Sequence, residues 1–81
     1  MSPKVPRDVS ANTLIKVLSK YGYTFVRQTG SNIRITVNTN EGVRNLTIPN
    51  HAPIKLGTLM SIINEASIQL KIDKDELISK L

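Results

Sequence analysis

The sequence predicts an α+β domain, a three-stranded antiparallel sheet with helices on one face and a short helix near the C-terminal end. Three observations predict this fold. A stripe of apolar residues at helical spacing precedes the middle of the chain, a second stripe follows it, and three strand-like segments joined by tight turns lie between them. The order is α-β-β-β-α plus the terminal helix. Because each long helix has a single apolar stripe, both pack against one face of the sheet and leave the other face polar.

The first helix is predicted over residues 10–21. Ser10 is a favourable N-cap, and Gly22 can adopt the left-handed conformation that ends a helix. Between them, apolar residues recur with i, i+3, i+4, i+7 spacing at Leu14, Val17, Leu18 and Tyr21. This spacing predicts one buried side for the helix.

Three strands are predicted to follow. The first covers residues 23–29, and one of its faces consists of Tyr23, Phe25 and Arg27. The second alternates most regularly, with its inward positions at Ile33, Ile35 and Val37. Arg34 and Thr36 then lie on the opposite, polar face. A hairpin loop over residues 38–42 leads to a third strand that contains Val43, Leu46 and Ile48.

The second long helix is predicted to begin near Gly57-Thr58, with Thr58 as its cap. Its apolar stripe consists of Leu59, Ile62, Ile63, Ala66 and Leu70. Asp73 and Glu76 have the spacing of a capping box, an N-cap acid with Glu three residues later, which predicts a short last helix.

The length of 81 residues and the composition predict a single domain over 1–81, with residues 1–9 as a flexible arm that holds two prolines. The chain has no cysteine, which excludes disulfides and thiolate metal sites. No apolar run approaches the roughly 20 residues that span a bilayer, and no signal-peptide pattern is present. These features predict a cytoplasmic protein.

The positive charge is concentrated in the first two-thirds of the chain. Residues 1–57 hold eight lysines and arginines against two acids, a net charge of +6, whereas residues 58–81 hold three lysines against four acids, a net charge of −1. This asymmetry favours a surface that binds a polyanion. The alternative is a charge that only keeps the protein in solution.

Two loops are the candidate sites for chemistry. The first is Gly30-Ser31-Asn32, beside Arg27, where glycine lets a phosphate approach the backbone and the polar groups can hydrogen-bond it. Its alternative interpretation is a simple β-turn. The second runs from Pro49 to Thr58 into a helix N-terminus, which favours an anion and has Lys55 nearby.

His51, in the second loop, is the single histidine, and it is either a supporting site residue or a loop histidine bonded to backbone. The sequence contains no phosphate-binding P-loop, no dinucleotide-binding glycine pattern and no HExxH motif. We therefore expect no cofactor and no metal.

Together the two loops resemble the HicA family of bacterial toxins, the RNA-cleaving members of toxin–antitoxin pairs. The first block of the resemblance is Arg27, Gln28, Gly30 and Ser31, and the second is Ile48, Pro49, His51, Lys55, Gly57, Thr58, Leu59 and Ile62. The resemblance covers roughly residues 10–80. It implies the fold of a double-stranded-RNA-binding domain, cleavage of mRNA, and a HicB-type antitoxin that covers the active site.

The resemblance also implies roles for single residues. Arg27, Gly30, Ser31 and Arg34, together with Lys55, Gly57 and Thr58, would bind the RNA phosphates. Where the family has its catalytic histidine, this chain has Asn32. Imidazole titrates near neutral pH and can transfer a proton, whereas an amide cannot. The resemblance therefore predicts an endoribonuclease that is inactivated here but still binds RNA and the antitoxin.

Three alternatives concern this position and the basic surface. Asn32 is either an engineered replacement, which the otherwise intact motif favours, or a natural variant. The chain is either a disabled nuclease or an RNA-binding module that performs no chemistry. The basic face is also suited to an acidic antitoxin, which is compatible with RNA binding.

Overall fold

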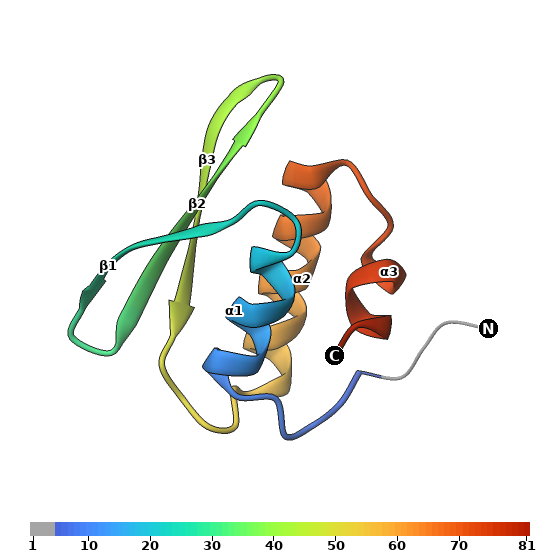
Figure 1. The fold of residues 1–81 in the computed structure, drawn as a ribbon. Helices are drawn as coiled ribbons and strands as arrows, with labels where there is room; N and C mark the ends of the chain where they lie inside the picture. The colour runs from blue at the N-terminus through green and yellow to red at the C-terminus, as the bar shows by residue number, and fades with distance from the viewer. Residues whose placement is uncertain (1–4) are drawn as a thin grey trace.

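The computed structural model describes residues 5–81, and its elements follow the predicted order. The elements are α1 (Ala11–Ser19), β1 (Thr24–Thr29), β2 (Asn32–Thr39), β3 (Gly42–Pro49), α2 (Leu56–Leu70) and α3 (Lys74–Ser79). The strands pair antiparallel in the order β1-β2-β3, and the helices lie together on one side of the sheet (Figure 1). The α+β prediction, including the terminal helix, is confirmed. Within residues 5–81, no helix combines the length and apolarity needed to cross a membrane.

Helix α1 begins as predicted but ends earlier. The Ser10 hydroxyl accepts a hydrogen bond from the Thr13 amide at 3.1 Å, so Ser10 is the N-cap. The helix ends at Ser19 and not at residue 21, because the next residues bond three residues back and form a turn, with the Tyr21 amide donating to the Leu18 carbonyl at 2.9 Å. Gly22, with φ of +102°, then reverses the chain into β1.

The inner face of the sheet forms the core with the helices. The alternation predicted for β2 is confirmed, since Ile33, Ile35 and Val37 are all buried. On β3, Leu46 and Ile48 are buried, but Val43 is 58% exposed. Val43 pairs with Asn38, which follows the inward-facing Val37 and therefore points outward. Val43 thus belongs to the outer face.

Strand β1 contains an irregularity that the sequence pattern did not predict. Phe25 pairs with Ile35 but Arg27 pairs with Arg34, so Val26 is an extra residue in a β-bulge. A bulge reverses the side on which the following residues point. The prediction that Arg27 shares a face with Tyr23 and Phe25 is therefore wrong, and Arg27 lies on the outer face.

The start of α2 also differs from the prediction. The helix begins at Leu56, with Lys55 as its N-cap, and the Lys55 carbonyl accepts the first helical hydrogen bond from the Leu59 amide at 2.8 Å. Thr58 lies inside the first turn and is not the cap. Burial of Ile54 in the core fixes the chain immediately before Lys55, so the helix starts earlier than the polar side chains suggested.

The last helix predicted from Asp73 and Glu76 is confirmed, but the Glu76 carboxylate accepts from the Tyr21 hydroxyl at 2.8 Å and does not complete the capping box. Asp73 is the N-cap of α3, and its carboxylate accepts from the Asp75 amide at 3.1 Å. In the predicted arm, residues 1–4 lie outside the described residues. Val9 is buried in the core and its carbonyl accepts from the Ile54 amide at 2.8 Å, so Val9 belongs to the folded domain.

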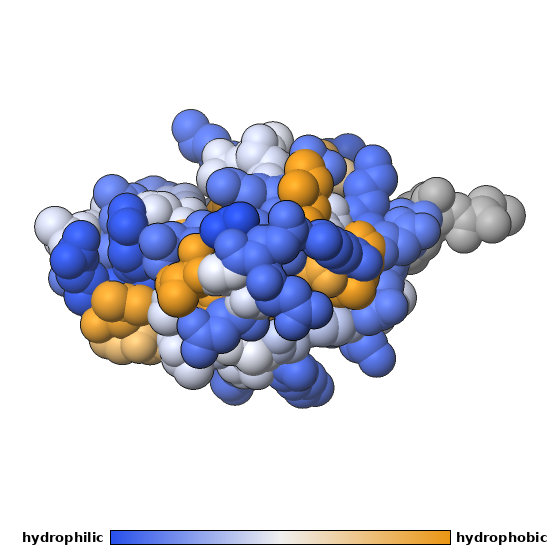
Figure 2. Space-filling model, turned by 90° about the horizontal axis from the view of Figure 1, so that it is seen from above, coloured by the Kyte–Doolittle hydropathy of each residue, from blue (hydrophilic) through white to orange (hydrophobic). Residues whose placement is uncertain are grey.

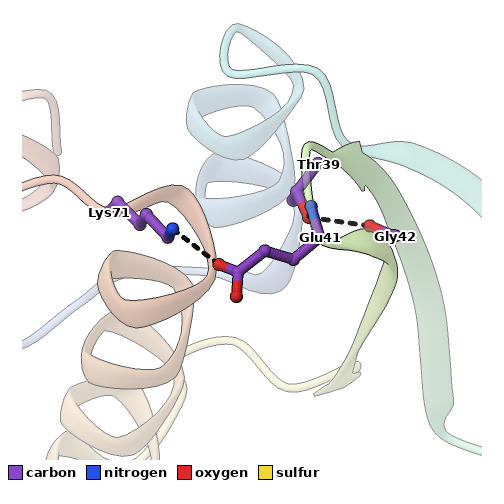
Figure 3. A network of polar contacts seen from close by, with 4 residues as sticks. All are labelled: Thr39, Glu41, Gly42 and Lys71. Carbon is purple, nitrogen blue, oxygen red and sulfur yellow. Dashed lines mark hydrogen bonds and ion pairs between the residues drawn. The ribbon is translucent and has the colours of Figure 1, made fainter.

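The β2–β3 hairpin is linked to the C-terminal end of α2 (Figure 3). Lys71 Nζ lies 2.7 Å from Glu41 Oε1, and the Thr39 hydroxyl donates to the Gly42 carbonyl at 2.7 Å across the turn. The ion pair lowers the pKa of the Glu41 carboxyl, chiefly through the hydrogen bond from Lys71. Both side chains are exposed, so the pair orients the hairpin more than it stabilises the fold.

Candidate functional site

The outer face of the sheet contains an open hollow of about 250 Å³. Its lining comes from all three strands and consists of Arg27, Thr29, Asn32, Arg34 and Thr47. The pairing register explains this gathering, because directly paired residues of neighbouring strands share a face. Arg34 pairs with Arg27 on one side and with Thr47 on the other, and Asn32 pairs with Thr29.

The chemistry of this hollow suits an anion. It has two guanidinium groups, two hydroxyls and one amide, and no carboxylate lines it. Within residues 5–81, neither arginine takes part in an ion pair. Like charges at directly opposed strand positions destabilise a sheet, so the pairing of Arg27 with Arg34 costs stability that a bound anion would relieve. Arginine is also well suited to phosphate oxygens, since its planar fork can donate two parallel hydrogen bonds.

The predicted Gly30-Ser31 turn lies immediately beside the hollow, although neither residue lines it. Gly30 has φ of +59°, the left-handed conformation that this tight turn between β1 and β2 requires. The Gln28 amide group donates to the Gly30 carbonyl at 3.1 Å and closes the turn. Both turn residues are exposed, so a ligand can reach the turn.

The structure brings the two candidate loops together. The Asn50 amide donates to the Ser31 carbonyl at 2.6 Å, and Asn32 pairs with Pro49 across β2 and β3. His51 is exposed and follows directly, with its own backbone carbonyl accepting from the Ala11 amide at 3.1 Å. The start of β2, the end of β3 and the N-terminus of α1 therefore meet beside Asn32.

Comparison with models of protein families gives a match over residues 11–68, more than half of the chain, to the family described as the HicA toxin of bacterial toxin–antitoxin systems. The chain belongs to the HicA toxin family. Membership makes it the toxin of such a pair and implies an antitoxin partner. Searches of curated proteins and of solved structures gave no match.

The matched region of this HicA toxin runs from the start of α1 through most of α2. It contains the hollow, the Gly30-Ser31 turn and the loop around His51. It ends before α3, which packs through Leu77 and Ile78 against the core. The part of the chain that matches the family therefore contains all nine site residues that the sequence predicted: Arg27, Gly30, Ser31, Asn32, Arg34, His51, Lys55, Gly57 and Thr58.

Three predicted phosphate-binding residues are separate from the hollow. Lys55, Gly57 and Thr58 lie at the start of α2, and none of them lines it. All three are exposed, and no side chain caps this end of the helix, so the amides of its first turn remain open. This helix end has the groups needed to bind an anion, but it forms a second location and not part of one continuous pocket.

Sequence reasoning missed two residues of the hollow, Thr29 and Thr47. A signal for Thr47 was available, because it stands between the inward-facing Leu46 and Ile48 and must point outward. Thr29 could not be placed in the same way, since its side depends on the bulge at Val26. In the described part of the chain, no three histidine or carboxylate side chains gather as a metal site would require.

Proposed function

We propose that this HicA toxin binds RNA across the outer face of its sheet, and that position 32 is the position from which an active relative transfers a proton during mRNA cleavage. The observation that carries the proposal is the hollow shared by Arg27, Asn32 and Arg34. Two unpaired cations beside the family's catalytic position suit a backbone phosphate next to the bond to be cleaved. The target would be mRNA in the cytoplasm.

The residues have separate roles in this proposal. Arg27 and Arg34 hold one phosphate in the hollow, and the open backbone at Gly30-Ser31 contacts the same strand of RNA. Lys55 and the free amides at Gly57 and Thr58 bind a second phosphate at the start of α2. His51 does not line the hollow. It follows Asn50, which contacts Ser31, so its side chain would bind a ribose or a phosphate next to the hollow.

Asn32 accounts for the expected loss of cleavage. Backbone cleavage needs a group that accepts the proton of the 2′-hydroxyl or donates one to the leaving oxygen near neutral pH. The hollow contains arginine, threonine and asparagine side chains, and none of these titrates in that range. Asn32 can still hydrogen-bond a phosphate, so the chain retains binding and lacks the proton transfer.

The test is the substitution Asn32→His, with Asn32→Gln as the matched control that enlarges the side chain without adding a titratable group. We expect Asn32→His to cleave RNA about 10²–10⁴ times faster than the parent chain, because general acid–base catalysis typically contributes that much. Cleavage should persist with a chelator present, and expression of the variant should arrest growth. Absence of RNA cleavage by Asn32→His, while RNA binding is retained, would contradict the role of position 32.

A second function is an RNA-binding module that never performs chemistry, and the absence of a titratable group in the hollow supports it. This module would bind RNA in a salt-sensitive way, as the nuclease would, but would cleave it neither as Asn32 nor as Asn32→His. The same assay therefore separates the two functions.

We also propose that a HicB-type antitoxin inhibits this toxin by covering the hollow. The acid-free outer face and the net charge of +5 suit an acidic protein as well as RNA. Competition tests this mechanism. RNA bound by the toxin should be displaced when the antitoxin is added, and an antitoxin complex that still binds RNA with full affinity would exclude it.

A further inference from the structure

Strand β1 exposes two large apolar side chains next to each other. Phe25 is 62% exposed and Val26 is 45% exposed, and every residue of β1 is exposed. The strand extends beyond the helices that cover β2 and β3 (Figure 1). Seen from above, apolar surface appears at the end of the molecule where β1 lies, next to hydrophilic surface (Figure 2). We call Phe25 and Val26 the β1 apolar pair.

The bulge places the β1 apolar pair beside the hollow but not in it. Phe25 pairs with Ile35 and so lies on the helix-covered side of the sheet, whereas Arg27 pairs with Arg34 and lies on the outer face. Val26 is the bulged residue between them. A ligand confined to the outer face would contact Arg27 without reaching Phe25. A partner that covers the free edge of β1 would contact both.

The free edge favours a protein that docks with its side chains. In the described residues β1 pairs with β2 alone, so its other edge has no strand beside it. A bulge disrupts the regular ladder that an added strand would need. Phenylalanine and arginine are also among the residue types that are enriched in protein interfaces.

Charge favours an acidic partner over a second copy of this chain at the free edge. A second copy of the chain, docked at the same edge, would bring two sets of Arg27 and Arg34 together and would carry the same net charge of +5. An acidic partner would instead neutralise both arginines while covering the apolar pair. The family supplies a protein partner of this toxin, the antitoxin.

We infer that the β1 apolar pair is the anchor by which an acidic antitoxin grips this toxin, with Phe25 and Val26 buried in the partner and Arg27 paired with one of its carboxylates. The inference rests on the antitoxin partnership of the proposed function. It assigns part of the affinity for the antitoxin to Phe25 and Val26, which do not line the hollow, whereas Arg27 would be shared by the antitoxin and RNA.

The experiment compares the double variant Phe25→Thr/Val26→Thr with the parent chain in titrations of its cognate antitoxin and of a short RNA. Threonine keeps the strand preference of both positions. We expect the Kd for the antitoxin to rise by about 10- to 100-fold, as for loss of an interface anchor, while the Kd for RNA changes less than about twofold. The matched control is Ile68→Gln, which removes an apolar side chain of 68% exposure from α2 and should leave both values unchanged.

Three outcomes would overturn the inference. The first is unchanged antitoxin affinity in the double variant, and the second is an equal loss of RNA affinity, which would make the pair an RNA-stacking surface. The third is a parent chain that is dimeric by light scattering and a double variant that is monomeric, which would assign the edge to a second copy. If the double variant does not fold, Val26→Thr alone carries the same comparison. If the parent chain does not bind RNA, the proposed RNA binding is wrong. The antitoxin titration would still test the role of the β1 apolar pair.

Discussion

The two faces of the sheet are made by alternate residues of the same strand, yet they have opposite chemistry. The inner positions of β2, Ile33, Ile35 and Val37, are no more than 5% exposed and join both long helices in the core. The outer positions Asn32 and Arg34 line a hollow that is open to solvent. Burial and exposure therefore alternate between neighbouring residues, and changes one position apart in sequence should have separable effects on stability and on the proposed binding.

The outer face contains a pair of like charges that destabilises the sheet. Arg27 and Arg34 are paired directly across two strands, where opposite charges or threonines would stabilise the sheet. The inner face contains no such conflict, and among the described residues no buried side-chain polar atom lacks a hydrogen-bond partner. Local conflict confined to one face is typical of a surface arranged for a ligand.

The largest effect that tests this division is expected at the centre of the inner face. Ile35→Ala removes a fully buried side chain and should lower the free energy of unfolding by about 2–5 kcal/mol. Urea denaturation measures it. The neighbouring change Arg34→Ala, on the outer face, should leave the same free energy nearly unchanged or slightly raised, because it relieves the repulsion from Arg27.

A loss of that size is a large fraction of the stability of a small domain. If Ile35→Ala does not fold, Ile35→Val provides the measurement, with an expected loss of about 0.5–1.5 kcal/mol. Equal losses for Ile35→Val and Arg34→Ala would show that the two faces are not energetically distinct.

The next effect concerns the inner face at alkaline pH. Tyr23 is buried, and its hydroxyl donates to Gln69 Oε1 at 2.7 Å. Burial, with a smaller contribution from the charge of Glu65, raises the pKa of Tyr23 to about 12 from 10.0. A raised pKa in the folded state means that the stabilisation is complete below pH 10 and is lost as the pH rises toward 12, by up to about 2–3 kcal/mol.

Tyr23→Phe isolates this contribution from the titration of the lysines. At pH 8 the variant should be about 1 kcal/mol less stable than the parent, because the hydrogen bond to Gln69 is lost. Between pH 10 and 12 the parent should lose more stability than the variant, so the difference between them should shrink and then reverse. Parallel stability curves over this range would show that Tyr23 ionises without hindrance in the folded state.

Much of the inner face could be predicted because it depends on local periodicity. The alternation of β2 and the stripe of α2 identify buried residues directly, since apolar side chains must leave water on one side of each element. The caps at Ser10 and Asp73 were also readable, because a polar side chain beside a helix start satisfies its free amides wherever the helix lies.

The outer face depends on pairing between strands, and much of this is invisible in a single sequence. The bulge at Val26 decides that Arg27 shares a face with Arg34, and nothing in the residue types there requires it. The start of α2 at Leu56 depends on Ile54 being held in the core, a long-range contact that outweighed the cap signal of Thr58. The contact between Asn50 and Ser31 follows from the register of β2 and β3. The sequence therefore predicts each loop separately but not that the two loops touch.

The smallest expected effect tests the outer face itself. Arg34→Ala removes one of the two cations of the hollow and, at about 0.15 M salt, should weaken RNA binding about fivefold and reduce the slope of log Kd against log salt by about 1. The matched control is Arg44→Ala on β3, which removes the same charge from a residue that pairs with Val37 and does not line the hollow. Arg44→Ala should change RNA affinity by less than half as much on a logarithmic scale. Equal losses in affinity and in salt slope would mean that RNA responds only to the total charge, and the outer face would then have no special role in binding it.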